Sequence, residues 1–267
     1  MAIQAKLRTE IINVTPTQAK QWLDKNTMNR QVREERAAQY ADDMKAGRWR
    51  FTHQGIAFYA DGTLADGQHR LHAITLYGKP VQMLVTRGLP RETGQAIDQN
   101  LPRMTHDAIR IGGGPEWIER NVVATTRVLL NYMNADTKAH SVAEIVDYAT
   151  RHADHMKLSQ ALVAVKKRNV TSASIAACYF CAMKAGEDKD KIKRFADIML
   201  HGEIAGPHEN AAIRLREFLI SEGGRAWMGY TRMETARKVQ RAIQLFCEGK
   251  PTAKLYTPEK LVYPIPH

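Results

Sequence analysis

The segment that spans residues 55–80 constrains the fold more strongly than the rest of the chain. It opens with a short apolar run and continues with an Asp-Gly pair at positions 61 and 62, which is typical of tight hairpin turns. After Gly67 the apolar side chains recur at roughly helical spacing, until Gly78 and Pro80 end the pattern. The segment therefore predicts a β-hairpin, a glycine turn and a helix that begins beside Gly67.

The turn at Gly67 has the features of an anion-binding site. The first amide groups of a helix have no partner within the helix, and the helix dipole is positive at this end. Gly67 has no side chain to keep an anion from the backbone, and Arg70, one turn into the helix, can direct several donors at a phosphate. A purely structural interpretation is also open, in which Asp66 is only the N-cap and Arg70 only a surface charge.

The first part of the chain alternates strands and helices. Besides the hairpin and its helix, we expect strands over residues 7–14 and 81–86 and helices over residues 15–25, 33–46 and 91–97. The glycine-rich stretch at residues 112–115 is the clearest interruption of the sequence, and we place a domain boundary between residues 114 and 115.

After residue 114 the pattern changes to helices. They are expected over residues 115–133, 156–166, 172–185, 188–201, 209–221 and 231–248, with a further helix that starts at residue 141. The proline-containing tail from Gly249 is expected to be extended, and either packed back on the helices or loose. The predicted fold class is α+β: a small domain of mixed sheet and helices over residues 1–114, followed by an all-helical domain over residues 115–267.

The chain is strongly basic. It carries 39 Lys and Arg against 28 Asp and Glu, a net charge of +11 that is spread over both parts. This excess favours nucleic acid as a partner, with DNA the expected form, although nucleotide phosphates could explain a few of the arginines. Two short basic clusters of the helical part could contact a nucleic-acid backbone, although solvated charged faces also explain them. They consist of Lys166, Lys167, Arg168, Arg214 and Arg216.

Several other features point to a reduced protein of the cytoplasm. No apolar run is long enough to cross a membrane, and the first residues lack the apolar core of a signal peptide. Three cysteines do not suggest a disulfide framework. Cys178 and Cys181 lie in an apolar run, so we interpret them as buried helix residues rather than as zinc or redox groups. His152 and His155 are expected on a solvated helix face.

Three short motifs of the first part occur in the order seen in one known superfamily. They are an Asn-Arg pair, a Gly-x-x-Arg-x-x-Ala motif and a Gln-Asn-x-x-Arg motif, at residues 29–30, 67–73 and 99–103. With the strands and helices between them, they resemble the ParB/sulfiredoxin-like superfamily over residues 10–110. The Asp-Gly-Gln-His-Arg form of the second motif is similar to that of uncharacterised phage proteins. In the third motif Gln99 stands where the family carries Glu.

The resemblance implies a fold more firmly than a function, because the superfamily is chemically diverse. Its members include CTP-binding DNA clamps, ATP-dependent sulfinic acid reductases, a free-serine kinase and proteins described as nucleases. Sulfiredoxins carry a catalytic Cys where this chain has Gln68, which argues against the reductase activity. The serine kinases have the residues that stand here at Asp66, Gly67, His69 and Arg70, and this likeness favours ATP-type phosphate chemistry. The resemblance implies that the protein acts in the cytoplasm of a bacterium or a phage-infected host cell.

The resemblance also implies a site for a nucleoside triphosphate, either ATP or CTP, with Mg²⁺. Its binding residues would be Asn29, Arg30, Gly67, Gln68, His69, Arg70, Asn100 and Arg103. Oxygen ligands for Mg²⁺ would come from Asp98 and Asn100, with Asp66 as a further candidate. Asp66, His69 and Glu34 are the candidate catalytic residues, although His69 could instead be a structural residue bonded to the backbone.

Three functions fit these observations. The leading hypothesis is a nucleotide-binding, DNA-associated protein that hydrolyses the nucleotide or transfers its phosphate with the help of Mg²⁺. The second is a DNA nuclease, suggested by Asp66, His69 and His72, which lie close together in the sequence. The third is a non-catalytic regulator or clamp, with a homodimer as one arrangement, in which the turn binds nucleotide or DNA backbone and the helical part binds a partner.

Overall fold

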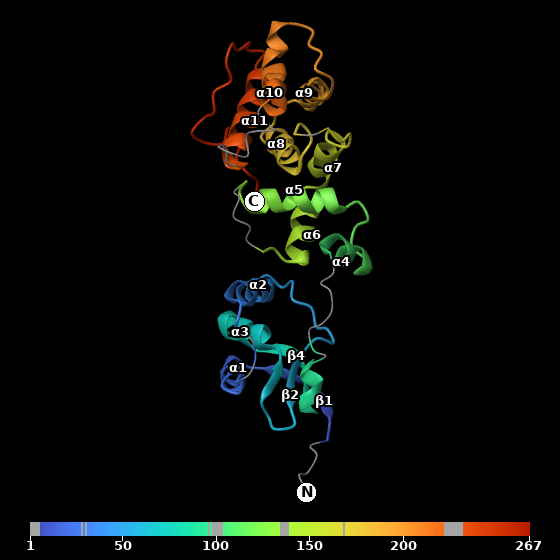
Figure 1. Ribbon diagram of the computed structural model, residues 1–267, viewed down its shortest axis with the longest axis vertical. Helices are drawn as coiled ribbons and strands as arrows, with labels where there is room; N and C mark the ends of the chain where they lie inside the picture. The colour runs from blue at the N-terminus through green and yellow to red at the C-terminus, as the bar shows by residue number, and fades with distance from the viewer. Residues whose placement is uncertain are drawn as a thin grey trace. The chain divides into compact units, whose positions relative to one another are not determined.

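The computed structural model describes residues 6–27, 29, 31–95, 97, 104–133, 139–167, 169–221 and 232–267. They form a mixed sheet with helices followed by an all-helical region, so the predicted α+β class is confirmed (Figure 1). The chain divides into two compact units: residues 1–103 with 139–144 make the first unit, and residues 104–138 with 145–267 make the second. The stretch at residues 112–115, where we placed the boundary, lies within the second unit, and the domain assignment stays a prediction.

The first unit is built on a sheet. Its described elements are, in order, β1 (Arg8–Val14), α1 (Pro16–Leu23), α2 (Glu34–Lys45), β2 (Ile56–Tyr59), β3 (Leu64–Asp66), α3 (Gln68–Tyr77), β4 (Val81–Leu89) and the 3-10 helix η1 (Arg91–Gln95). The strand order is β1-β4-β2-β3, with β2 parallel to β4 and the other two pairs antiparallel. The predicted hairpin is therefore β2–β3. The strand β4 continues past residue 86, where we expected it to end, because Arg87 pairs with Arg8 of β1 and Leu89 pairs with Tyr59 of β2.

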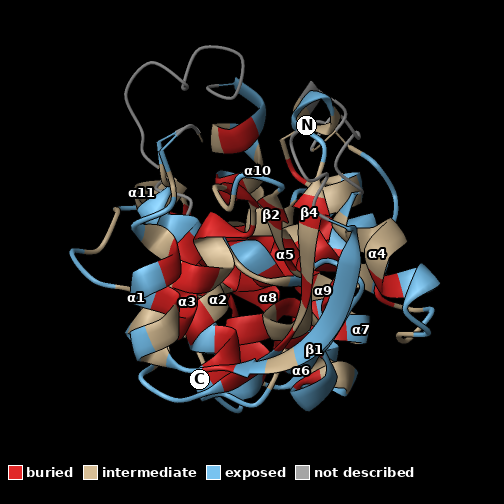
Figure 2. Cartoon of the chain, turned by 90° about the horizontal axis from the view of Figure 1, so that it is seen from below, coloured by how far each residue is buried: buried red, intermediate tan, exposed pale blue. Residues whose placement is uncertain are grey.

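The three helices of the first unit share one apolar core with the sheet. Val14 and Val85 of the strands are buried in it together with Leu71 and Ile74 of α3. The helix α3 packs against both α1 and α2, beside the strands (Figure 1). Because α3 is held on several sides, the position of its first turn relative to the sheet is fixed. The edge strand β1, in contrast, is exposed along most of its length (Figure 2).

The second unit is helical. Its described elements are α4 (Thr105–Ile111), α5 (Arg120–Leu130), α6 (Val142–Arg151), α7 (Ala153–Ala161), α8 (Ala173–Lys184), α9 (Lys189–His201), the 3-10 helix η2 (Pro207–Glu209), α10 (Asn210–Ser221) and α11 (Arg232–Cys247). The first residues of α6, as far as Glu144, are assigned to the first unit. Every residue of α8 from Ile175 to Met183 is buried, as expected for a helix that is apolar on all sides. The side chains of Ser172 and Asp188 cap α8 and α9, so the predicted starts of these helices are confirmed.

Two helices of this unit differ from the prediction. The helix expected from residue 115 begins at Arg120, because the Ile118 N–H donates to the Pro115 carbonyl in a preceding turn. The helix expected over residues 156–166 is α7, which starts earlier, directly after His152. His152 is buried and lies edge-on to the rings of Tyr148 and Phe180, so the predicted solvated position was wrong for this residue.

The tail after Gly249 follows no regular helix or strand and packs on the helices, as one form of the prediction had it. Tyr263 is buried, its N–H donates to Gln240 Oε1 at 2.9 Å, and its hydroxyl donates to Glu187 Oε1 at 2.9 Å. Asn210 and Thr252 exchange two further hydrogen bonds. The tail is thus a structural part of the second unit.

The cysteines of α8 lie in its core. Cys178 and Cys181 are free thiols, both are buried, and burial raises the pKa of each, to about 12 for Cys181. Their interpretation as buried helix residues is confirmed. Among the described residues, no helix is long and apolar enough to cross a membrane.

Candidate nucleotide site at the start of α3

Gly67 forms the turn between β3 and α3, and it is the N-cap of this helix. Its φ of +103° lies in the left-handed region, which favours glycine. A Cβ atom at this position would lie 3.0 Å from the Ile56 Cα and 3.1 Å from the Gly55 carbonyl oxygen. Glycine is therefore required both by the backbone conformation and by the close packing of the turn against β2.

Asp66 lies over the start of α3. Its Oδ1 accepts the Gly67 N–H at 2.6 Å, and its Oδ2 is 3.8 Å from an NH1 atom of Arg70. The interpretation of Asp66 as the N-cap was wrong, because the cap position belongs to Gly67, which has no side chain to accept the helix amides. The contacts show what the turn attracts: a carboxylate is placed where the helix dipole and a guanidinium both favour negative charge.

Arg70 is held in a fixed position. Its side chain is 13 % exposed, and its NH2 donates to Gln54 Oε1 at 3.1 Å while NH1 faces Asp66. The structural interpretation of Arg70 as a surface charge was therefore wrong. A guanidinium has five N–H donors, so these two contacts leave capacity for a further acceptor.

Asn29 and Gln68 belong to one chain of hydrogen-bonded side-chain amides. Asn29 Nδ2 donates to Asn26 Oδ1 at 2.6 Å and to the Leu64 carbonyl at 2.9 Å. Asn26 Nδ2 in turn donates to Gln68 Oε1 at 3.0 Å, and Gln68 is 6 % exposed. Through Asn26, Asn29 is thus connected to Gln68, the first residue of α3.

His69 makes the backbone contact that the structural interpretation predicted. Its Nε2 accepts the N–H of Arg33 at 3.1 Å, so the ring carries its proton on Nδ1 when it is neutral. Glu34, which follows Arg33 in the chain, is exposed at the start of α2. Burial lowers the pKa of His72, and the charge of Glu34 acts in the opposite direction. The side chain of Glu34 is therefore electrostatically coupled to His72.

The remaining predicted site residues lie outside the described residues. They are Arg30, Asp98, Asn100 and Arg103, together with Arg168 of the basic clusters. Among the described residues, no group of three or more His, Cys, Asp or Glu could hold a metal ion. Asp66 is the predicted metal ligand that the structure describes, and a single carboxylate fits Mg²⁺, which is commonly bound by one or two carboxylates together with substrate phosphates.

The two basic clusters of the second unit are largely engaged in structural contacts. The Lys167 Nζ donates to the carbonyl of Leu200, in the last turn of α9. A Cβ atom at Gly202, the C-cap of α9, would lie 3.1 Å from the Arg216 Cζ. Both cations therefore lie at the negative end of that helix dipole.

Arg214 and Lys166 are the other described members of these clusters. Arg214 lies 3.1 Å from Glu217 on the same helix, and Lys166 is exposed. An exposed ion pair of this kind is a common feature of solvated helices. The contacts of these clusters favour the solvated or structural interpretation over a nucleic-acid surface.

Gln54 and Asn26 are site residues that the sequence did not reveal. Gln54 is 16 residues from Arg70 and Asn26 is 42 residues from Gln68. Gly55, beside Gln54, has no space for a side chain, because a Cβ there would lie 1.8 Å from the Leu84 carbonyl oxygen. The close approach of β2 to β4 thus positions Gln54, and no short-range pattern encodes it.

The chain matches no family model, no curated protein and no solved structure. The resemblance to ParB/sulfiredoxin-like proteins therefore stays a prediction that rests on the three sequence motifs.

Proposed function

We propose that the first unit binds the phosphates of a nucleoside triphosphate, ATP or CTP, together with Mg²⁺ at the start of α3. The observation that carries this proposal is the fixed guanidinium of Arg70 above a glycine-capped helix N-terminus. Backbone amides and a guanidinium in the first turn of a helix are suited to a phosphate. Gln54 on one side and Asp66 on the other reduce the freedom of Arg70, so little side-chain entropy is lost on binding.

Asp66 would have two effects in such a site. Without metal, its carboxylate competes with a phosphate for the Gly67 N–H and for Arg70. With Mg²⁺, the same carboxylate can serve as the protein ligand, and the metal offsets the repulsion between carboxylate and phosphate. We therefore expect nucleotide binding to depend strongly on Mg²⁺.

The expected reaction is hydrolysis or phosphate transfer, with Asp66 and Glu34 as the candidate groups of the chain. His69 is a weaker candidate for a general base, because its Nε2 lone pair accepts the N–H of Arg33. The same contact weakens the nuclease hypothesis, which uses His69. Binding of nucleotide without turnover would instead support a non-catalytic clamp. We also propose that the protein binds nucleic acid, because its net charge of +11 favours a polyanionic partner.

The test is calorimetric titration with ATP, CTP and GTP, each with Mg²⁺, of the wild-type chain and the Arg70→Ala variant. We expect at least one nucleotide to bind and Arg70→Ala to weaken its binding by roughly 10-fold or more, since a hydrogen bond to a charged group contributes about 1.5–3 kcal/mol. Arg151→Ala is a matched control, because Arg151 also pairs with an aspartate one turn earlier, at 2.7 Å from Asp147. No binding of any nucleotide by the wild type, or equal binding by Arg70→Ala, would contradict the proposal.

Asp66→Asn separates the two effects of the carboxylate. We expect this variant to bind nucleotide more tightly than the wild type in the absence of Mg²⁺ and more weakly in its presence. Unchanged binding under both conditions would show that Asp66 faces neither the phosphate nor the metal. Release of phosphate by the wild type and by Glu34→Gln then decides between turnover and a clamp.

A further inference from the structure

The loop between α2 and β2 is basic and aromatic. Residues 44–60, between Asp43 and Asp61, include no acidic residue. Within them, basic and aromatic side chains alternate over residues 48–51, in the order Arg-Trp-Arg-Phe. The loop itself, residues 46–55, has no helix or strand, and it follows α2 directly. Interleaved cations and aromatic rings are the features that single-stranded nucleic-acid sites combine.

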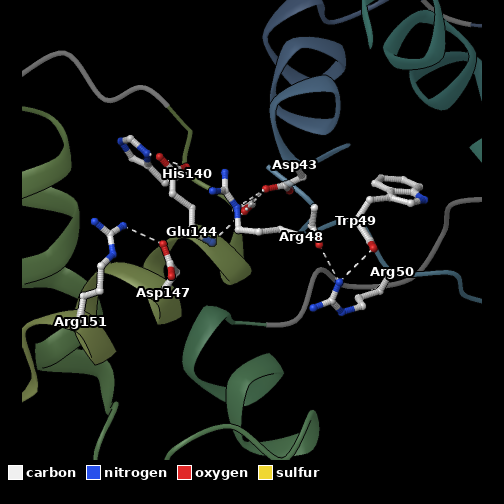
Figure 3. A network of polar contacts seen from close by, with 10 residues as sticks. Asp43, Arg48, Trp49, Arg50, His140, Glu144, Asp147 and Arg151 are labelled. Carbon is white, nitrogen blue, oxygen red and sulfur yellow. Dashed lines mark hydrogen bonds and ion pairs between the residues drawn. The ribbon is translucent and has the colours of Figure 1, made fainter. Parts of the chain in front are cut away.

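The start of this loop is fixed by Asp43 (Figure 3). The Asp43 carbonyl accepts the N–H groups of Arg48 and Trp49 at 2.8 and 3.1 Å. Its carboxylate Oδ1 accepts from Arg48 Nε at 3.0 Å and from the Ser141 hydroxyl at 2.8 Å. The charge of Arg48 is thus neutralised within the first unit, and the loop is held in one conformation.

Trp49 and Arg36 extend this ordered surface along α2. The ring of Trp49 lies edge-on to Tyr40 with centres 5.3 Å apart. Arg36 stacks over the Tyr40 ring at 4.9 Å and donates to its hydroxyl at 3.1 Å. The exposed Arg36 guanidinium thus lies against the same Tyr40 ring that Trp49 of the loop contacts.

Arg50 and Phe51 are exposed in the middle of the loop. Arg50 NH1 donates to the carbonyls of Gly47 and Trp49 (Figure 3). Among the described residues, no carboxylate pairs with its charge. Phe51 is 46 % exposed, and no described ring or cation stacks on it. A positioned cation and an open aromatic face thus stand next to each other in the chain.

The end of the loop leads to the proposed phosphate site. Thr52 and Gln54 exchange hydrogen bonds across a short turn, and Gln54 Oε1 accepts from Arg70. The loop is therefore fixed at both ends, while its middle carries the exposed Arg50 and Phe51. Such preorganisation lowers the entropy that a bound strand would cost the protein.

We infer that residues 48–54, with Arg36, form a binding surface for single-stranded nucleic acid. Phe51 stacks on an unpaired base, and Arg50 and Arg36 contact the phosphates. The unpaired bases of a single strand expose their faces, whereas those of a duplex are stacked on one another. A short irregular loop also lacks the form of the helix or strand pair that enters the major groove. This inference rests on the nucleic-acid part of the proposed function and does not need the nucleotide.

The test is fluorescence anisotropy with a labelled oligothymidylate of about 20 nucleotides and with a duplex of equal length, without nucleotide or Mg²⁺. Phe51→Ala should weaken single-strand binding by about 5- to 150-fold, the range measured for one stacked base. Phe51→Trp should bind like the wild type, and Phe51→Leu should not, because leucine keeps the apolar surface without the aromatic face. Tyr256→Ala is the matched control, since Tyr256 is 69 % exposed and lies beside a cation, with Lys254 Nζ at 5.3 Å from its ring.

Salt dependence separates the stacking residue from the phosphate contact. Arg50→Ala should reduce the slope of log affinity against log salt by about 0.7, the value for one phosphate contact to a single strand, and Phe51→Ala should leave it unchanged. Equal affinity of the wild type, Phe51→Ala and Arg50→Ala, or tighter binding of the duplex, would overturn the inference alone. Failure of the wild type to bind either oligonucleotide would overturn the nucleic-acid part of the proposed function as well. Circular dichroism of each variant checks that it is folded.

Discussion

Replacing Gly67 by alanine is expected to destabilise the first unit by about 2–5 kcal/mol. Two effects add up. A non-glycine residue in the left-handed region costs about 1–2 kcal/mol. The new Cβ would also lie 3.0 Å from the Ile56 Cα and Cγ1 and 3.1 Å from the Gly55 oxygen, where overpacking costs about 1–3 kcal/mol. Two of these three neighbours are backbone atoms, so the strand β2 itself has to move.

Gly78 at the other end of α3 provides the matched control. Its φ of +77° is also left-handed, but no atom lies within 4 Å of a Cβ built there. Gly78→Ala should therefore show the conformational cost alone, about 1–2 kcal/mol. The difference between the two variants measures how closely the turn packs against β2.

The assay is urea unfolding followed by tryptophan fluorescence in a background with Trp117→Phe and Trp227→Phe. The remaining tryptophans, Trp22 and Trp49, both lie in the first unit, so the signal reports that unit alone. With a slope of about 2 kcal/mol per molar urea, Gly67→Ala should lower the midpoint by roughly 1–2.5 M. A midpoint for Gly67→Ala equal to or above that of Gly78→Ala would refute the reasoning, because the close contacts would then carry no cost.

Three further predictions concern the second unit. Hydrogen bonds from Arg194 hold the pKa of the Glu209 carboxyl below its usual 4.5. The stabilisation that this carboxylate gives is complete above pH 4.5 and is lost as the pH falls through the lowered pKa. We therefore expect Glu209→Gln to have a lower melting temperature than the wild type at neutral pH, and a smaller decrease of the melting temperature in acid. Tyr263→Ala should release the tail and lower stability by about 3–5 kcal/mol, seen as faster protease cleavage after residue 249; unchanged cleavage would mean that Tyr263 is no anchor. Cys178 and Cys181, whose pKa is raised by burial, should resist thiol reagents near pH 8 until the unit unfolds, and fast labelling of the native protein would contradict their burial.

Local rules account for the parts of the fold that the sequence predicted well. The hairpin, the end of α3 at Gly78 and the caps at Ser172 and Asp188 depend on residues within one turn of each other. Such features follow from backbone sterics and from hydrogen bonds that a single side chain can supply. The mixed sheet and the helical region followed from the same patterns. Helix ends that depend on a turn outside the pattern, as before Arg120, were displaced.

The site was predictable only in its central turn. Asp66, Gly67 and Arg70 are adjacent in the chain, and their grouping follows directly from the turn. The contacts that orient them come from residues far away in sequence, such as Gln54, and are set by the packing of the sheet. The structural alternative, with Asp66 as the N-cap, was wrong because the sequence does not show that Gly67 itself takes the cap position.

The position of a cation in the sequence says less about its role than the group that it meets. Arg48 and Arg50 are two residues apart in one loop, yet Arg48 is neutralised by Asp43, while Arg50 donates to two carbonyl groups and pairs with no carboxylate in the part of the chain that the structure describes. Lys167, within the densest basic run of the helical part, donates to the carbonyl of Leu200 at the end of α9. A cation already satisfied by a carboxylate or by helix carbonyls must break that contact to bind a phosphate, which weakens its net contribution. The less clustered Arg50 is therefore the better phosphate contact, although the sequence pattern favoured the run that contains Lys167.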